Sequence, residues 1–151
     1  MPLQSESEDF MPLNSISVGI WITYNECSIT AHRNLLDELA VEESDNIFRF
    51  EKSKDINSAT VIEFFYFIRS QPHQIEEEVE ELFAICTSWL MKQNEDIFKV
   101  GIREGLKISF EIGGWLDDGN QLYDFVIPAK LLFQLGRLEL SVEMTLNDYH
   151  R

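Results

Sequence analysis

Apolar and polar positions alternate in two long stretches, one near each end of the chain. The segment "SISVGIWITY" at 15–24 places four aliphatic residues on one face, namely Ile16, Val18, Ile20 and Ile22. The segment "RLELSVEMTLN" at 137–147 does the same with Leu138, Leu140, Val142, Met144 and Leu146. A period of two is typical of a β-strand with one buried face. We therefore predict a strand in each segment, with Glu139 and Glu143 on the solvated face of the second.

Further strands are predicted between these two. "NIFRFE" indicates a short strand at 47–51, and "ATVIEFFYFIR" at 59–69 is apolar on both faces, which favours a strand covered on two sides. "LKISFEIG" alternates again, with Glu111 on the outward face. The turn residues of "GGWLDDGNQ" predict a hairpin that leads into a strand near 122–126.

Helical spacing appears in three segments. "SITAHRNLLDELAV" has a capping-type residue at its start and Leu35, Leu36 and Leu39 at helical intervals. A second helix is predicted from the region of Pro72 to about Gln93. Its apolar stripe is expected to hold Ile75, Val79, Leu82, Phe83, Cys86, Trp89 and Leu90. Pro128 opens a short third helix, and Gly136 is expected to mark its end.

These elements predict the class α+β. We expect an antiparallel or mixed sheet of about five to six strands, with two main helices on one face. Residues 1–14 are expected to form a flexible acidic tail, and residues 15–151 a single domain, because the length suits one hydrophobic core.

Composition narrows the classes of partner. The chain has 12 Lys and Arg against 27 Asp and Glu, which gives a formal net charge of −15. Nucleic acids are bound by clusters of Lys and Arg, so this balance argues against them and favours a basic protein surface. The first ten residues hold no Lys or Arg, and no apolar stretch approaches the ~20 residues of a membrane span. We therefore expect a cytoplasmic protein without a signal peptide or a membrane partner.

The sequence offers few candidates for catalysis or metal binding. We interpret His32 as a packed residue, because it shares the apolar side of the first helix with Leu35 and Leu39. The two cysteines have no metal-binding spacing, and we interpret Cys86 as an inert thiol of the core. No catalytic or phosphate-binding motif occurs. We therefore predict no enzyme activity, no metal site and no cofactor.

Two acidic segments are candidates for contact with a partner. The run of five glutamates at 76–81 is explained by the solvated face of a helix, with a partner site as the alternative. The predicted hairpin combines aromatic and acidic residues, as interface hot spots with an acidic rim do. An aromatic tucked against the edge of the sheet is the alternative for Trp115. The predicted contact residues are Trp115, Asp117, Asp118, Tyr123 and Asp124, joined by Glu111, Glu139 and Glu143.

The C-terminal third resembles a bacterial family of unknown function, the domain numbered 4279. In that family an alternating strand precedes a Pro-x-x-Leu-Leu-x-x-Leu-Gly helix, and a last strand ends in an acidic residue. The matching positions are Pro128, Leu131, Leu132, Leu135, Gly136 and Asp148. The family's Leu-Gly-Ile-x-Pro after the first helix is replaced here by "LAVEES". The resemblance implies residues that maintain the fold and implies no catalytic site.

In size and acidity the chain is also similar to immunity proteins of polymorphic-toxin and contact-dependent inhibition systems. This likeness implies a binding protein that neutralises a basic toxin domain, for example a nuclease, by covering it. The alternative hypothesis is a small-molecule sensor or regulatory domain of ferredoxin-like type. A hydrolase with a carboxylate pair is a third hypothesis.

Overall fold

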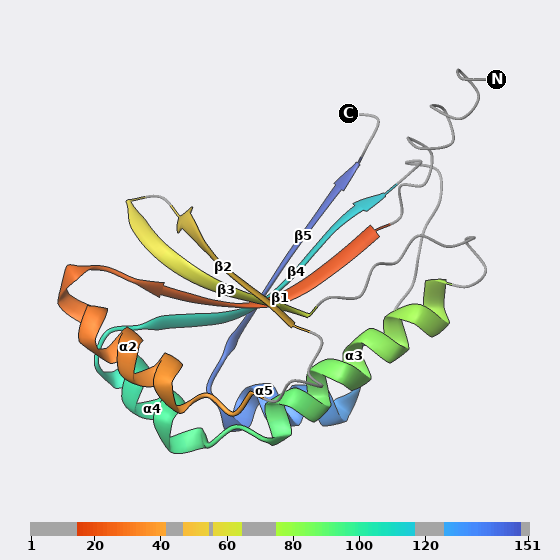
Figure 1. The fold of residues 1–151 in the computed structure, drawn as a ribbon. Helices are drawn as coiled ribbons and strands as arrows, with labels where there is room; N and C mark the ends of the chain where they lie inside the picture. Colours follow the sequence, from red (N-terminus) through yellow and green to blue (C-terminus); the bar gives the residue numbers. More distant parts are fainter. Residues whose placement is uncertain (1–14, 42–46, 55, 65–74, 117–125, 149–151) are drawn as a thin grey trace.

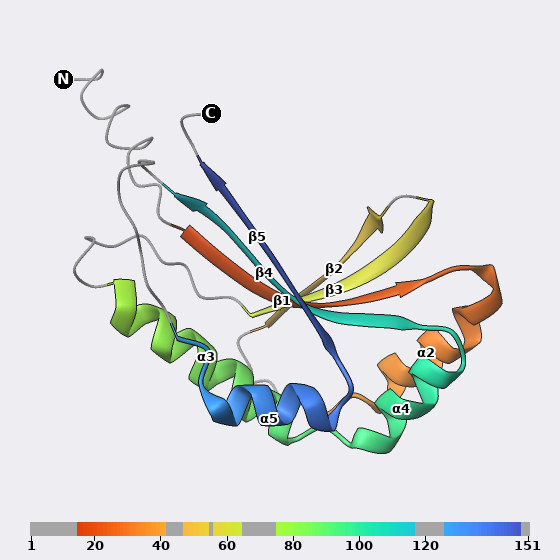
Figure 2. The ribbon, with the colours of Figure 1, turned by 180° about the vertical axis from the view of Figure 1, so that it is seen from behind.

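One five-stranded sheet and one layer of helices make up the part of the chain that the computed structural model describes, residues 15–41, 47–54, 56–64, 75–116 and 126–148. Figures 1 and 2 show all four α-helices of this part on the same side of the sheet. The predicted α+β class is therefore confirmed. The strands are β1 (Ser15–Tyr24), β2 (Ile47–Lys54), β3 (Asn57–Phe64), β4 (Lys107–Leu116) and β5 (Ser141–Asp148). The helices are the 3-10 helix η1 (Glu26–Ser28), α2 (Ile29–Glu38), α3 (Ile75–Met91), α4 (Glu95–Arg103) and α5 (Ala129–Arg137).

The central strand is β1, and the order across the sheet is β2-β3-β1-β4-β5. Strand β1 runs antiparallel to both neighbours, with Ile20 opposite Ile62 of β3 and Phe110 of β4. All three side chains are buried in the core between the sheet and the helices. The alternation in the sequence determines this arrangement, because a shift by one residue would turn the apolar side chains of β1 away from the helices.

The sheet is mixed rather than wholly antiparallel. Strands β2 and β3 are antiparallel, whereas β5 runs parallel to β4 and follows it through α5. The direction of the strands rotates from β2 to β5 in Figures 1 and 2, which is the twist expected of a sheet of L-amino acids. The edge strands are β2 and β5.

Helix α3 confirms the predicted amphipathic stripe. Its buried residues are Val79, Leu82, Phe83, Cys86, Trp89 and Leu90. Among its glutamates, Glu77, Glu80 and Glu81 are exposed. The helix layer consists of two pairs, because α2 packs against α4 and α3 packs against α5. The glutamate run is thus the solvated side of a core-packed helix, as its spacing predicts.

Helix α4 has no counterpart among the predicted elements. Asn94 caps its first turn by accepting a hydrogen bond from the backbone N–H of Asp96 at 2.8 Å. Glu95 and Asp96 then lie at the positive end of the helix dipole. Phe98 and Gly101 are buried, so one side of this short helix belongs to the core.

The last strand is shorter than its alternation predicts. Helix α5 continues through Gly136 to Arg137, and the backbone N–H of Leu138 and of Leu140 bond back to the carbonyls of Gln134 and Leu135. The chain therefore turns before β5 begins at Ser141, and Glu139 takes a left-handed conformation with φ 60°. The predicted third helix is therefore confirmed, and it ends one residue after Gly136.

The predicted buried face of the last strand is also only partly correct. Leu138 and Leu140 are buried, but they belong to the helix end and the turn. Val142 and Met144 lie in β5, next to Phe110 and Ile112 of β4, yet they keep 43% and 47% of their surface exposed. Position at the edge of the sheet explains this, since β5 has a neighbour on one side only.

Some predictions fall outside the described residues. These are the tail at 1–14, the start of the second helix near Pro72, and most of the predicted strand at 122–126. Val126 itself is described and lies in no strand. Among the described helices none has the length and apolar character needed to cross a membrane.

Candidate functional site

The face of the sheet that carries no helix brings together two of the predicted contact residues. Glu111 of β4 is the register partner of Glu143 of β5, and on its other side it is opposite Gly19 of β1. Gly19 in turn is opposite Glu63 of β3, and Glu63 is opposite Phe48 of β2. One row of side chains therefore crosses all five strands. We call its three carboxylates, Glu63, Glu111 and Glu143, the acidic row.

The acidic row is half-buried rather than fully exposed. Ser109 donates a hydrogen bond of 2.8 Å to the carboxylate of Glu111. Neighbouring strands lie about 4.8 Å apart, so like charges side by side on β4 and β5 repel each other. Glu111 and Glu143 therefore concentrate negative charge on this face of the sheet. The row is therefore suited to hold positive charge.

An aromatic patch lies on the same face, beside the acidic row. It consists of Trp21, Phe48 and Phe50, and Trp21 and Phe50 are both opposite Val61 in the register. The rings of Phe48 and Phe50 have centroids 5.6 Å apart, and Phe48 keeps 54% of its surface exposed. The ammonium group of Lys52 lies 5.5 Å from the centroid of the Trp21 ring. Aromatic side chains next to charged ones are typical of protein contact surfaces.

The sequence reasoning did not identify this patch or Glu63. The alternation of β1 does place Trp21 opposite the apolar face of its strand, and the alternation of β2 places Phe48 and Phe50 on one face. These two patterns are the available signal. What the sequence lacks is the register, which is needed to see that these residues adjoin Glu111 and Glu143.

The other predicted contact residues are not all brought to this face. The backbone of Trp115 in β4 is opposite Ser15 and Asn147, in line with Glu111 along the strand. Glu139 is separated from the row, because it lies in the turn before β5 with its carboxylate 3.9 Å from the ammonium group of Lys99. Its predicted place on the face of the last strand is wrong. Asp117, Asp118, Tyr123 and Asp124 lie outside the described residues.

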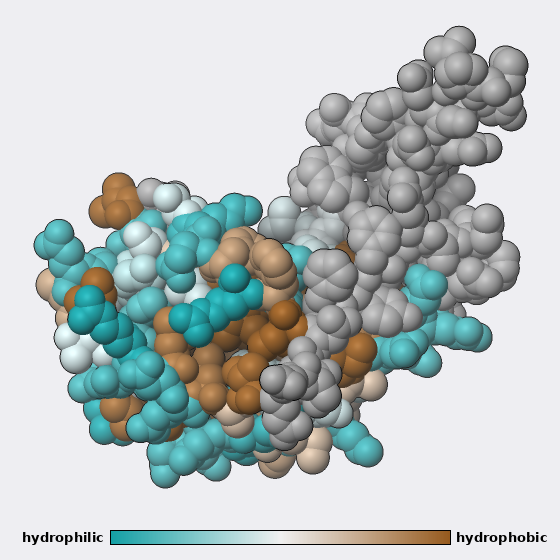
Figure 3. All heavy atoms as spheres, viewed as in Figure 1, coloured by the Kyte–Doolittle hydropathy of each residue, from teal (hydrophilic) through white to brown (hydrophobic). Residues whose placement is uncertain are grey.

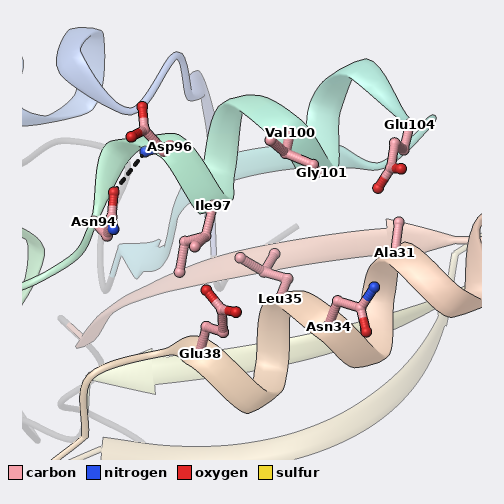
Figure 4. Close-up of a pocket in the computed structure, with 10 residues that line it drawn as sticks. All are labelled: Ala31, Asn34, Leu35, Glu38, Asn94, Asp96, Ile97, Val100, Gly101 and Glu104. Atoms are coloured by element: carbon pink, nitrogen blue, oxygen red, sulfur yellow. Dashed lines mark hydrogen bonds between the residues drawn. The ribbon is translucent and has the colours of Figure 1, made fainter.

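A groove of about 350 Å³ separates α2 from α4 on the helix layer (Figure 4). The two helices are antiparallel there, so Ala31 faces the end of α4 and Glu38 faces its start. The floor is apolar, and the rim is polar or acidic. The floor residues are Ala31, Leu35, Ile97, Val100 and Gly101, and the rim residues are Asn34, Glu38, Asn94, Asp96 and Glu104. The surface over α2 and α4 is largely hydrophilic in Figure 3.

A chain of polar contacts joins α2 to the β2–β3 hairpin. The ring of His32 stacks on that of Tyr24 with centroids 3.7 Å apart, and its Nε2 is 2.7 Å from the hydroxyl of Thr60. Thr60 donates its hydroxyl proton to Glu51, which also accepts a bond of 3.0 Å from the Tyr24 hydroxyl. The hydroxyl of Thr60 is completely buried. The geometry therefore ties elements together, and a substrate has no access to that hydroxyl.

Burial sets the ionisation of this cluster. It lowers the pKa of His32, an effect that Glu51 partly offsets and that Arg49 and Arg33 increase. Burial likewise raises the pKa of Tyr24, and so does the adjacent carboxylate of Glu51. Near neutral pH we therefore expect a neutral imidazole and a protonated phenol. His32 is packed and hydrogen-bonded, as its position on the apolar side of the first helix predicts.

The cysteines and the acidic side chains form no metal site in the described part of the chain. No group of three or more His, Cys, Asp or Glu side chains gathers there in a way that could hold a metal ion. Cys86 is completely buried, and burial raises the pKa of its thiol. Cys27 is exposed.

No protein-family model, curated protein or solved structure matches the chain. The resemblance to the domain numbered 4279 and the likeness to immunity proteins therefore stay predictions.

Proposed function

We propose that this protein is a non-catalytic binding protein that holds a basic protein partner on the helix-free face of its sheet. The observation that carries the proposal is the acidic row of Glu63, Glu111 and Glu143 beside an aromatic patch. The aromatic side chains supply contact area, and the carboxylates supply complementary charge. The net charge of −15 would accelerate the encounter with a basic surface.

The partner class that suits this surface is a basic toxin domain. An immunity protein of the cytoplasm has to associate quickly and cover its toxin, and an acidic surface around aromatic anchors serves both needs. A nuclease domain is one such partner, because it carries positive charge to bind phosphates. In this proposal Trp115, Asp117, Asp118, Tyr123 and Asp124 also contact the partner.

The test starts from capture of a partner and continues with purified components. This protein is used as bait in lysate of its own source, washed at low and then at high salt. The retained basic protein is purified, and its association rate is measured from about 50 to 500 mM salt. We expect the association rate to fall strongly with salt and the dissociation rate to change less. A flat association rate contradicts the electrostatic role.

Charge reversal then locates the surface. The double variant E111K/E143K should slow association by about tenfold or more, since it removes the steering charge from the contact face. The matched control is E77K/E80K on α3, where both glutamates are exposed on the helix layer and the net charge changes by the same amount. Equal effects of the two variants would show that only the net charge matters and would contradict this surface.

A further inference from the structure

The groove between α2 and α4 is a second surface, independent of the helix-free face. We propose that it binds an amphipathic helix with basic residues from a partner protein. This inference goes beyond the proposed function, because it concerns the opposite layer of the molecule. It does not require that the helix-free face binds anything.

The charges of the groove point to a positively charged occupant. Glu38 extends from the end of α2 toward Ile97, and Glu104 extends from the end of α4 toward Ala31, so each end of the groove holds a carboxylate (Figure 4). Asp96 also lines the groove, but its carboxylate points away from α2 in Figure 4. The groove has no basic residue in its lining.

The nearest lysine of α4 is turned to other partners. Lys99 pairs with Glu95 at 2.8 Å and lies 3.9 Å from Glu139. Within the described part of the chain, neither Glu38 nor Glu104 takes part in an ion pair. The negative charge of the groove is therefore available to a ligand from outside.

The distance between the acidic ends of the groove determines how far apart the lysines of a bound helix should lie. Glu104 lies opposite Ala31 of α2, and Ala31 is seven residues from Glu38, which corresponds to about 10.5 Å along a helix axis. Two lysines seven residues apart on an incoming helix are separated by about 10.5 Å on the same face. Each lysine can therefore reach one acidic end of the groove.

The apolar floor of the groove favours apolar residues between those lysines. Leu35 is buried, Ile97 is half-buried and Val100 is 40% exposed, so an apolar surface lies between the acidic ends. A volume of about 350 Å³ accommodates a few side chains rather than a complete helix. Helices that bind in grooves insert one stripe of side chains at intervals of three or four residues. A leucine between two lysines is thus the pattern that this groove fits.

The experiment uses a defined probe. The probe is a capped peptide of about 14 residues, four helical turns, with two lysines seven residues apart and leucines between them on the same face. The control peptide carries glutamates in place of the lysines. Binding to the full chain is followed through backbone amide shifts. We expect saturable shifts at Leu35, Ile97 and Gly101 with the lysine peptide, and none with the glutamate peptide.

Variants separate the groove from the helix-free face. E38K/E104K should weaken binding of the lysine peptide at least tenfold, whereas E77K/E80K and E111K/E143K should leave it unchanged. Shifts centred on Trp21 and Glu111, or equal weakening by E77K/E80K, would overturn the groove. Spermidine that binds the groove more tightly than the peptide, or a second copy of this chain seated there, would overturn the helical occupant. None of these results bears on the effect of E111K/E143K on the association rate of a captured partner. The proposal for the groove and the proposal for the helix-free face can therefore be refuted independently.

Discussion

The imidazole of His32 on α2 and the hydroxyl of Thr60 on β3 form a buried hydrogen bond of 2.7 Å. Thr60 has one hydroxyl proton, and it donates this proton to Glu51. The oxygen of Thr60 must therefore accept from His32, which fixes the proton of the neutral ring on Nε2. This single hydroxyl connects α2 to the edge strand β2.

The stability of the protein should depend on the charge of His32. Burial lowers the pKa of His32 below 6.5, the value expected of the unfolded chain. Below pH 6.5 the unfolded chain binds the proton more readily than the folded one, so the free energy of unfolding should fall as the pH falls through this range. The measurement is urea unfolding at several values from about pH 5 to 8, where histidine titrates.

The control for this pH dependence is the variant H32Q. Glutamine retains an N–H donor but does not titrate. H32Q should be less stable than the natural chain, because it loses the stacking on Tyr24, and its stability should vary less with pH over the same range. An equal slope in both proteins would show that His32 does not titrate differently on folding. Effects of Glu95, whose pKa is lowered by Lys99, fall below pH 4.5 and outside this window.

Replacement of Thr60 by valine should remove the hydrogen bonds from Thr60 to His32 and Glu51 while the volume of the side chain stays similar. In T60V, the Nε2–H of His32 loses its acceptor inside the core, which costs about 1–3 kcal/mol for an unsatisfied buried group. Chemical denaturation at neutral pH measures this loss. T145V on β5 is the matched control, because Thr145 is exposed. A loss no larger than that of T145V would contradict the role of the hydroxyl.

Local patterns were sufficient for the elements that bury one face. The alternation at Ser15–Tyr24 and the stripe from Val79 to Leu90 each predict both the element and its buried side. The partners of His32 could not be predicted, because Glu51 and Thr60 come from two other elements and meet it only through the strand register. The acidic row has the same origin, since Glu63 is not close in sequence to Glu111 or Glu143.

The C-terminal strand shows why alternation alone is ambiguous. Leu138 and Leu140 fit both the period of a strand and the end of a helix, and the backbone bonds to Gln134 and Leu135 decide for the helix end. Helix α4 was missed for a different reason. Its first turn from Glu95 is polar, which is typical of a connection between two elements.

Gln93 should be required for the connection between α2 and α3. Its amide accepts from the backbone N–H of Ala40 at 2.9 Å and donates to the carbonyls of Ala40 and Trp89 at 2.9 and 3.0 Å. The side chain is almost completely buried. In Q93L the groups of Ala40 lose their partners, so the free energy of unfolding should fall by about 1–3 kcal/mol. Urea unfolding measures this change.

A second glutamine serves as the control for this substitution. Gln134 on α5 is half-buried and accepts one bond of 2.8 Å from Arg137. Q134L should therefore cost about 0.5–1.5 kcal/mol, the value of a single exchanged hydrogen bond. A larger loss for Q134L than for Q93L would mean that the segment after α2 is not held by Gln93.

Two glycines should respond in opposite directions to replacement by alanine. Gly136 lies inside α5, and a Cβ added there would meet nothing within 4 Å. G136A should therefore raise the free energy of unfolding by about 0.5–1 kcal/mol, through the higher helix propensity of alanine. Gly105 follows α4 and has φ +106°, a backbone conformation that residues other than glycine rarely adopt. G105A should lower the free energy of unfolding by about 1–3 kcal/mol. Urea unfolding of both variants against the natural chain decides the matter. A loss of stability in G136A would contradict this prediction. It would indicate that Gly136 is needed as a glycine at the end of the helix, although the left-handed residue of this turn is Glu139.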